Sequence, residues 1–431
     1  MRAGQPDPVR DKAPVDLTVE RLGSQGDGIA QHRGEPVFLP FTVPGDRVLA
    51  RLGARRGGGR EGRIVERLCS GPERTEPRCR HFGTCGGCAL QHLDAELYQA
   101  VKTDRLRGAL ESVGIDPAVV GSLKTVPPGR RRARLGLTRA RDPRLPVRLG
   151  YRERFRHDLV DLQDCPVLEP ALFAVSLALR RVAGDFVAPG GDAEVIITRT
   201  DSGIDVTIET VEEPGLVALE ALVGFAEQCD LARVVWHSRI DEIVVVERRP
   251  VRVILSGVAV PCPPGAFLQA SQSAEVMLVE EVLSGVGSGR PVLDLFAGLG
   301  SFTFALARDG PVHAIEGDKR TAAALADAAI GQPGVTVEAR DLARNPLPRG
   351  SLRAYAAAVF DPPRAGAARQ AEGLAASSVE RIVAISCNPA TFARDAAILI
   401  AGGYRFEHVT PIDQFVWTPH LELAAVLRRN N

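Results

Sequence analysis

A cysteine at a predicted strand-to-helix junction is the residue of this sequence best placed for covalent chemistry. Cys387 lies in SCNPATFARD, after the strand-like run RIVAI and before the helix-like run ATFARDAAILIA. Asn388 suits a helix N-cap, and Pro389 suits the first helical position. A helix N-terminus stabilises a thiolate, so this arrangement predicts a nucleophile, whereas the alternative is a buried structural cysteine.

Four successive predicted strand ends carry groups that suit a nucleoside ligand. The apolar run PVLDLF leads into the glycine loop AGLG, and Glu316 ends the next strand, eighteen residues after Gly298. Asp341 and Asp361 follow the third and fourth strands. An acid after the second strand typically receives ribose hydroxyls, and Asp341 is placed to meet an adenine edge. The loop lacks the three-glycine pyrophosphate pattern, which favours S-adenosylmethionine over NAD. Each acid taken singly could instead be a helix cap or a turn residue.

A cysteine cluster near the front of the chain predicts a metal site. Cys79, Cys85 and Cys88 form C-x5-C-x2-C, and Cys165 is a plausible fourth thiolate from a distant loop. Four thiolates suit zinc or an iron–sulfur cluster. Zinc ribbons usually offer two C-x2-C pairs and this chain has one, so the pattern favours a [4Fe–4S] cluster, which we expect to be structural.

The elements that must position these residues predict a multidomain chain. We expect a disordered lead-in over 1–13 and a small β-barrel over 14–68, whose RRGGGR stretch forms a mobile basic loop. A central α+β domain that holds the cluster follows over 69–265, with a helix over 93–113 that could pack on the catalytic domain. Strands alternate with helices over 266–431, which predicts an α/β, Rossmann-like domain with a parallel, doubly wound sheet.

Charge is balanced overall but unevenly distributed. The chain has 53 basic and 53 acidic residues, yet residues 124–157 hold twelve Lys or Arg against two acids. Arginine suits bidentate phosphate contacts, although such a stretch could also be a solvated face. No stretch has the apolar length needed to span a bilayer, and the N-terminus lacks an apolar signal core. We therefore expect a cytoplasmic monomer with no membrane partner.

Nearly the whole chain resembles the RNA uracil-C5 methyltransferases, and specifically their 23S ribosomal RNA branch. The resemblance rests on a TRAM-like N-terminal barrel, the cysteine pattern, and the motifs FLQAS, DLFAGLGSF, AIEGD, DPPRAG, SCNPATFARD and HLE. It implies a catalytic domain that uses S-adenosylmethionine and a [4Fe–4S] cluster on Cys79, Cys85, Cys88 and Cys165. It also implies cofactor contacts at Gln269, Phe296, Ser301, Glu316, Asp341 and Asp361.

The same resemblance assigns the nucleophile to Cys387 and the base to Glu422. The thiolate would attack C6 of a flipped-out uracil, C5 would take the methyl group, and Glu422 would remove the C5 proton. Two departures from the family pattern concern the site. Ser301 stands where relatives often have Asn, and VWTPHLE stands where they often have FPHTxHVE.

Three alternatives remain at this point. Transfer RNA methylation at uridine 54 uses the same catalytic core, although the barrel and the cluster favour 23S ribosomal RNA as the partner. The 5-methylcytosine enzymes also attack C6 with a cysteine, but usually in a Pro-Cys-Ser setting that is absent here. A non-catalytic iron–sulfur RNA-binding protein would not need the intact strand-end acids and Cys387. In each alternative in which the protein binds RNA, the barrel and the basic stretch over 124–157 would hold the RNA.

Overall fold

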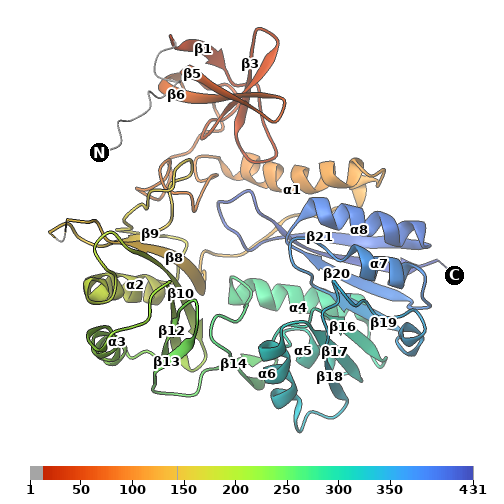
Figure 1. Cartoon of the computed structure of the whole chain (residues 1–431). Helices are drawn as coiled ribbons and strands as arrows, with labels where there is room; N and C mark the ends of the chain where they lie inside the picture. The colour runs from red at the N-terminus through yellow and green to blue at the C-terminus, as the bar shows by residue number, and fades with distance from the viewer. Residues whose placement is uncertain (1–12, 143, 431) are drawn as a thin grey trace. The chain divides into compact units, whose positions relative to one another are not determined.

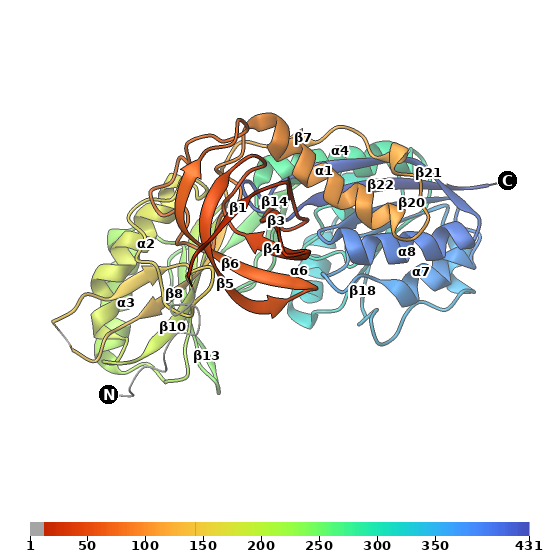
Figure 2. The ribbon, with the colours of Figure 1, turned by 90° about the horizontal axis from the view of Figure 1, so that it is seen from above.

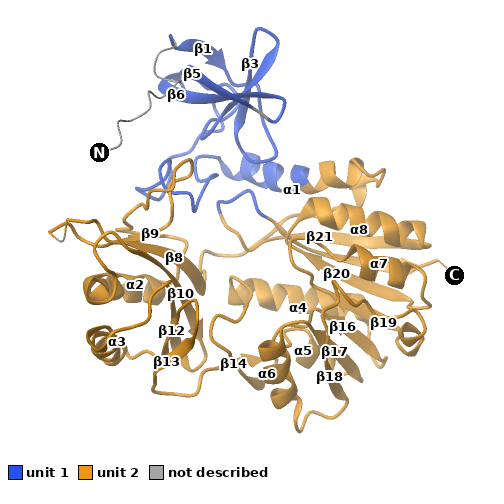
Figure 3. Cartoon of the chain, viewed as in Figure 1, with its two compact units in different colours: residues 1–105, 417–420 blue, residues 106–416, 421–431 orange. Residues whose placement is uncertain are grey.

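The computed structural model describes residues 13–142 and 144–430, and the chain divides into two compact units (Figure 3). The first unit comprises residues 1–105 and 417–420, and the second comprises 106–416 and 421–431. All but the last residue of the expected lead-in over 1–13 lies outside the described residues. None of the helices in the described ranges is long and apolar enough to cross a membrane.

The first unit contains a six-stranded sheet in the order β1-β5-β6-β4-β3-β2 (Figure 1). Strand β1 also contacts β3, so the sheet curls on itself. Alternating apolar side chains such as Leu17, Val37 and Val48 fill its interior. Its strands are β1 (Val15–Thr18), β2 (Arg21–Leu22), β3 (Gly28–His32), β4 (Glu35–Leu39), β5 (Arg47–Arg56) and β6 (Gly59–Cys69).

The RRGGGR stretch is a hairpin, so the expectation of a mobile loop over 55–60 is wrong. Strands β5 and β6 pair up to Arg56↔Gly59, which leaves only Gly57 and Gly58 as the turn. Both glycines have positive φ, at 56° and 81°, the left-handed conformation that a two-residue hairpin turn requires. The glycine- and arginine-rich composition led us to predict a loop here. Adjacent glycines also favour a tight hairpin turn, because they adopt positive φ readily.

The second unit begins with the end of α1 (Ala95–Glu111), which falls inside the helix expected over 93–113. A six-stranded sheet follows in the order β13-β12-β11-β10-β8-β9, and α2 and α3 pack on it. These elements are β8 (Arg132–Thr138), β9 (Arg148–Gly150), α2 (Pro170–Val182), β10 (Asp192–Thr200), β11 (Gly203–Glu209), α3 (Leu216–Gln228), β12 (Arg233–His237) and β13 (Glu242–Glu247), with the hairpin β14 (Arg252–Leu255) and β15 (Val258–Pro261) after them.

An eight-stranded sheet in the order β18-β17-β16-β19-β20-β22-β21-β7 forms the rest of the second unit. Its first five strands pair in parallel, as the alternation of strands and helices predicts. The strands are β7 (Lys124–Thr125), β16 (Val292–Leu295), β17 (Val312–Glu316), β18 (Val335–Ala339), β19 (Ala357–Phe360), β20 (Arg381–Ser386), β21 (Tyr404–Asp413) and β22 (Glu422–Arg429).

Helices cover both faces of this sheet. Along β20, Ile382 and Ala384 face one apolar core, which also holds residues of α7 and α8, whereas Val383 and Ile385 face another, against α4. Helices α7 and α8 lie side by side in both views (Figures 1 and 2). Leu106 of α1 joins the first core, so the end of that helix packs on this sheet. The helices are α4 (Gln272–Val286), α5 (Thr303–Leu306), α6 (Lys319–Ala329), α7 (Ala368–Ala375) and α8 (Pro389–Ala401).

The sheet is not parallel throughout, which corrects the expectation of a purely parallel arrangement. Strand β22 lies between β20 and β21 and runs antiparallel to both. A strand that follows a turn instead of a crossover helix pairs in the antiparallel sense. This insertion brings the start of β22 to the carboxyl end of β20.

Candidate active site

The carboxyl ends of five neighbouring strands meet at one edge of the eight-stranded sheet. Leu295 of β16 pairs with Phe360 of β19, which in turn pairs with Ala384 of β20. Glu316 ends β17 and pairs with Ala339 of β18. Parallel pairing therefore gathers at this edge the residues that follow each strand, and a ligand crevice is expected there. These residues are Phe296, Glu316, Asp341, Asp361 and Cys387.

The glycine loop after β16 leaves open space beside its backbone, as a ligand-binding loop does. Gly298 has a φ of 58°, and a Cβ added to it would meet no atom within 4 Å. Its amide donates to Glu316 Oε2 at 2.8 Å, while Glu316 Oε1 accepts from the amide of Asp318 at 2.7 Å. Phe296 also has a positive φ, of 60°, which is unusual for a bulky residue and common where a loop is shaped for a ligand. The open space and the acid fit a nucleoside ligand.

Asp294 lies beneath this loop and has a strongly perturbed carboxyl group. It is 1 % exposed, and its Oδ2 accepts a hydrogen bond from the Thr303 hydroxyl at 2.6 Å. Burial, followed by the nearby charges of Asp361 and Glu316, raises its pKa to about 7. The sequence shows an aspartate inside an apolar strand, but we assigned it no role from the sequence.

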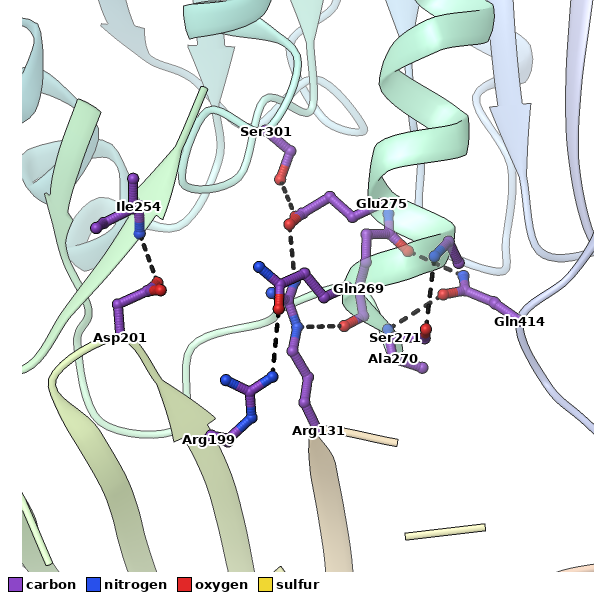
Figure 4. A network of polar contacts seen from close by, with 12 residues as sticks. Arg131, Arg199, Asp201, Ile254, Gln269, Ala270, Ser271, Glu275, Ser301 and Gln414 are labelled. Carbon is purple, nitrogen blue, oxygen red and sulfur yellow. Dashed lines mark hydrogen bonds and ion pairs between the residues drawn. The ribbon is translucent and has the colours of Figure 1, made fainter. Parts of the chain in front are cut away.

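Ser301 bonds within the protein, in a network that the sequence did not predict (Figure 4). Its hydroxyl donates to Glu275 Oε1 at 2.8 Å. Glu275 forms a buried ion pair with Arg131, whose Nη2 lies 3.0 Å from Oε2. The Arg131 Nε then donates to the backbone oxygen of Gln269 at 3.0 Å. Ser301 is thus connected through Glu275 of α4 to Arg131, the residue before β8. Arg131 and Glu275 are site residues that sequence reasoning missed.

Asp341 has the bonding of a turn residue. Its Oδ1 accepts from the amides of Ala343 and Arg344 at 3.0 and 3.2 Å, and its side chain is half exposed. The second carboxylate oxygen lies 3.6 Å from the Arg344 guanidinium. The carboxylate therefore shapes the loop after β18, and a ligand at this edge could reach it from solvent.

Strand register brings Cys387 and Glu422 together. Antiparallel pairing of β20 with β22 ends at Ser386↔Leu423, and the next pair in this register is Cys387 and Glu422. Asn388 caps α8 by accepting from the Ala390 amide at 3.2 Å, and Pro389 is the first helical residue, as predicted. The thiol therefore lies where a strand ends and a helix begins, with a carboxyl group opposite it.

The electrostatics of the thiol correct the expectation from the helix N-terminus. Burial, followed by the negative charges of Glu422 and Asp361, raises the pKa of Cys387 to about 11, whereas Arg364 acts in the opposite direction. The partial charge at a helix end is too small to outweigh burial beside two carboxyl groups. In this state of the protein Cys387 is a thiol and not a thiolate at neutral pH.

The two carboxyl groups of the site are also perturbed. Burial raises the pKa of Asp361 to about 7. Burial and the charge of Asp361 raise the pKa of Glu422 well above its ordinary value. Two buried carboxyl groups that repel each other hold protons at pH values where exposed acids are ionised. Such perturbed groups in a crevice are typical of catalytic sites.

Two glutamine side chains connect these carboxyl groups. The Gln414 Nε2 donates to Glu422 Oε2 and, at 2.9 Å, to Gln269 Oε1. The Gln269 Nε2 donates to Asp361 Oδ2 at 3.0 Å. Gln269 was predicted as a site residue from the FLQAS motif, whereas Gln414 was not. The only signal for Gln414 was its position at the end of a strand, directly after Asp413.

The cysteine-rich loop belongs to the first unit, between β6 and α1. The Cys79 amide donates to Gln91 Oε1 at 3.0 Å, and the Gly87 amide lies 3.4 Å from the Cys85 sulfur. Thiolates are the right donors for an iron–sulfur cluster, but no three His, Cys, Asp or Glu side chains within the described ranges are grouped to hold a metal ion. Cys88 follows in the same loop, and Cys165 lies in the second unit, after β9.

The loop also contacts the segment 417–420, within the same unit. The Trp417 carbonyl accepts from the amides of Ala89 and Leu90 at 2.8 and 3.0 Å, and the Trp417 amide donates to the Tyr98 hydroxyl at 2.9 Å. The Lys102 ammonium donates to the His420 carbonyl at 2.7 Å. Residues that follow the cysteines therefore fix the turn that precedes Glu422 along the chain.

Comparison with known proteins finds two matching domain families. Residues 339–430 match the family described as tRNA (Uracil-5-)-methyltransferase, and residues 13–53 match the TRAM domain. The first match contains Asp341, Asp361, Cys387 and Glu422. The second falls on the six-stranded sheet of the first unit.

Similar proteins extend over nearly the full chain. An uncharacterized RNA methyltransferase of Rhizobium meliloti is 41% identical over 96% of this chain and 99% of its own. The 23S rRNA (uracil(1939)-C(5))-methyltransferase RlmD of Halomonas elongata is 34% identical over 96% of this chain and 89% of its own. Among solved structures, the Pyrococcus abyssi tRNA (uracil-54, C5)-methyltransferase in complex with S-adenosyl-L-homocysteine has a TM-score of 0.72 at 24% identity, over 96% of this chain and 100% of that one. This last likeness shows a shared fold.

Proposed function

Because the chain belongs to the RNA uracil-C5 methyltransferase family, we propose that it methylates C5 of a uridine in 23S ribosomal RNA through a covalent bond between Cys387 and C6. The observation that carries the proposal is the register of β20 with β22, whose continuation pairs Cys387 with Glu422. C5 of uracil is a poor nucleophile. Addition of a thiolate at C6 converts the ring to an enolate whose C5 can accept a methyl group.

Removal of the C5 proton is the step proposed for Glu422. Once C5 carries the methyl group, its remaining hydrogen must leave as a proton so that the C5–C6 double bond re-forms and the Cys387 sulfur departs. Glu422 Oε1 is buried and has no hydrogen-bond partner among the described residues. A buried carboxylate oxygen without a donor is well suited to accept a proton that arrives with the substrate.

The thiol must lose its own proton before it attacks, since burial beside two carboxyl groups raises its pKa to about 11. S-adenosylmethionine supplies the methyl group when bound and carries it on a sulfonium cation. A bound cation would oppose the effect of Asp361 and Glu422 on the pKa of Cys387, in the same sense as the Arg364 guanidinium. We therefore expect Cys387 to become nucleophilic only in the loaded site.

The cofactor would occupy the crevice above the glycine loop. Three of the residues proposed to contact the cofactor form hydrogen bonds within the protein. Glu316 accepts from two backbone amides, Ser301 donates to Glu275, and Gln269 donates to Asp361. The full proposed set is Gln269, Phe296, Ser301, Glu316, Asp341 and Asp361. Glu316 and the open space beside Gly298 support a ribose at this position.

RNA would be held by the first-unit sheet and by the basic stretch over 124–157. Within that stretch, Phe155 is 60% exposed, and the Arg154 guanidinium lies 5.4 Å from the centre of its ring. Phe267, two residues before Gln269, is 65% exposed. Exposed aromatic rings beside arginine suit stacking with unpaired bases, which a flipped-out uridine requires.

The choice of 23S ribosomal RNA rests on the Halomonas elongata relative, which acts on that RNA by its name. The Pyrococcus abyssi neighbour is named as a tRNA (uracil-54, C5)-methyltransferase, so transfer RNA is the second candidate substrate. The relative with the 23S name has the higher identity, 34% against 24%.

A [4Fe–4S] cluster on Cys79, Cys85, Cys88 and Cys165 is part of the proposal. Its support is the three-plus-one cysteine pattern and the amide of Gly87 beside the Cys85 sulfur, since amide donors commonly stabilise cluster thiolates. Iron and sulfide analysis of anaerobically purified protein tests it, together with the visible absorption of the cluster. Protein that contains neither iron nor sulfide would contradict the assignment.

The decisive test uses labelled S-adenosylmethionine and purified protein with 23S ribosomal, 16S ribosomal and transfer RNA separately. We expect label in 5-methyluridine of the 23S RNA. Label in transfer RNA alone would exclude the ribosomal substrate, and no label in any uridine would leave a non-catalytic RNA-binding protein.

Two variants test the proposed roles. Cys387→Ala should bind S-adenosylmethionine but form no covalent RNA adduct, and an adduct in this variant would exclude Cys387 as the nucleophile. Glu422→Gln should form the methylated adduct and release it slowly, so that protein–RNA complexes accumulate on denaturing gels. Normal turnover by this variant would assign the base elsewhere.

A further inference from the structure

We propose that Gln414 is a positioning residue for the base, holding one oxygen of Glu422 so that the other is left to accept the C5 proton. The inference rests on the proposed function, because it concerns the carboxylate assigned to that proton transfer. Neither the comparisons nor the sequence motifs single out this glutamine. It is 6% exposed, and its amide nitrogen donates to Gln269 and to Glu422, the first residue of β22.

The orientation of the Gln414 amide is determined by its neighbours. Its Oε1 accepts from the backbone amide of Ala270 at 3.1 Å, and a backbone amide can only donate. The Nε2 group must therefore point the other way, where its two hydrogens meet Gln269 Oε1 and Glu422 Oε2. A reversed amide would face the Ala270 N–H with another donor and leave Glu422 with a repelling oxygen. Only one orientation satisfies the site.

The same reasoning extends to Gln269. Because its Oε1 accepts from Gln414, its Nε2 is directed toward Asp361 Oδ2 at 3.0 Å. Arg131 holds the backbone at this point, since its Nε donates to the Gln269 carbonyl (Figure 4). Its own amide donates to the Ala270 carbonyl. Ala270 thus holds Gln414, which aligns Gln269, and each glutamine offers one N–H to one carboxyl group.

This arrangement makes the two oxygens of Glu422 unequal. Oε2 has a donor, whereas Oε1 is buried with no hydrogen-bond partner in the described part of the chain. The charged or titratable groups around this carboxylate are Asp361, Cys387 and, toward the thiol, Arg364. The neutral amide of Gln414 stabilises the ionised form of Glu422 by a hydrogen bond. Loss of the Gln414 amide should let the Glu422 carboxylate rotate. It should also raise the pKa of Glu422 further.

A substrate analogue can separate proton removal from RNA binding and from attack of Cys387 on C6. With ordinary uridine, the Cys387–C6 bond breaks only after the C5 proton is removed. With 5-fluorouridine, C5 carries fluorine in place of that hydrogen, so the adduct forms and methylates but has no proton to lose. A variant impaired only in proton removal should form the 5-fluorouridine adduct at the normal rate and release the uridine adduct slowly.

The experiment compares Gln414→Met, Gln414→Glu and wild type on 23S ribosomal RNA transcripts made with uridine or 5-fluorouridine. If the labelled-cofactor assay marks transfer RNA instead, transfer RNA transcripts are used. Gln370→Met is the matched control, because Gln370 is 1% exposed and its Oε1 also accepts a backbone amide, that of Leu347, but it contacts no carboxyl group of the site. Any general loss of stability from a buried glutamine should appear in both methionine variants.

We expect Gln414→Met to release the uridine adduct roughly tenfold to a hundredfold more slowly, the range for losing a hydrogen bond to a charged group. Its 5-fluorouridine adduct should form within about twofold of the wild-type rate, and the acid limb of its release rate should move to higher pH. Gln414→Glu keeps the acceptor for Ala270 but loses the donors, so it should be slowed as well. Gln370→Met should release the adduct normally.

Release at the wild-type rate by Gln414→Met would overturn the inference, as would equal slowing by Gln370→Met. Equal slowing of both the uridine and 5-fluorouridine reactions would also overturn it, because the defect would then precede proton removal. Failure of the proposed function looks different, since the wild-type chain itself would then form no 5-methyluridine and no adduct.

Discussion

Asp361→Asn should make the protein more stable at alkaline pH, although it removes a proposed cofactor contact. In the folded protein, burial raises the pKa of Asp361 from its ordinary value of 3.8 to about 7. The folded state therefore keeps a proton that the unfolded chain gives up as the pH rises through this interval. Stability is greatest below the lower pKa and is lost as the pH rises toward 7. Asparagine does not titrate and escapes this loss.

The size of the effect follows from the shift. One pKa unit corresponds to about 1.4 kcal/mol, so a shift from 3.8 to about 7 costs the folded state about 4 kcal/mol once the carboxyl group is ionised. The asparagine amide could lose about 1–3 kcal/mol if one hydrogen has no acceptor. That loss is the same at every pH, so the change with pH isolates the carboxyl group. Between pH 5 and pH 7, the advantage of the variant over wild type should grow by about 2 kcal/mol.

Thermal unfolding from pH 5 to pH 8.5 measures this difference. The control is Asp205→Asn, because Asp205 is 3% exposed and forms a two-bond ion pair with Arg233, at 2.8 and 3.0 Å. Removing one partner of a buried pair should destabilise that variant by about 3–5 kcal/mol. A constant difference between Asp361→Asn and wild type across the pH range would refute the reasoning. So would a variant that becomes less stable than wild type as the pH rises.

Three further results should follow from the structure. Gly298→Ala should weaken S-adenosylmethionine binding at least about tenfold by calorimetry, because its Cβ would enter the open space of the loop. The control is Gly34→Ala, since Gly34 has a similar positive φ and equal open space; it should cost only about 1–2 kcal/mol of stability. Phe155→Ala should weaken RNA binding by about 1–3 kcal/mol in filter binding and leave cofactor affinity unchanged. Arg131→Met should destabilise the protein by about 3–5 kcal/mol, since it leaves Glu275 buried without its partner, whereas Met at the half-exposed Arg134 should cost about 1 kcal/mol or less.

The sequence predicted the residues of the site that follow parallel strands. Glu316 and Asp361 lie at one edge because every parallel strand of a doubly wound sheet ends on the same side. That rule needs only the alternation of strands and helices, which is visible in the chain. The cap at Asn388 was predictable for the same reason, since it depends on residues that are adjacent in sequence.

The sequence did not predict contacts that depend on register or on side-chain direction. Gln414 reaches Glu422 because β22 turns back between β20 and β21, and no local pattern marks that insertion. Arg131 reads as one member of a basic run, yet it is buried against Glu275, whereas Arg134 in the same run is half exposed. The state of the Cys387 thiol was misjudged because a helix terminus is visible in sequence and two carboxyl groups facing it are not.

The register of β20 and β22 also bears on how this enzyme can change over generations. Side chains alternate between the faces of a strand, so a slip by a single residue within β22 would turn Glu422 away from the thiol. Side-chain replacements at residues 416–419 should leave the pairing of Ser386 with Leu423 intact, because the bonds that hold this segment use backbone atoms of Trp417 and His420. The divergent residues 416–419 can therefore accumulate substitutions while the acid keeps its place opposite the nucleophile. Lineages should differ in the composition of this turn and remain fixed in the spacing of the strand that follows it.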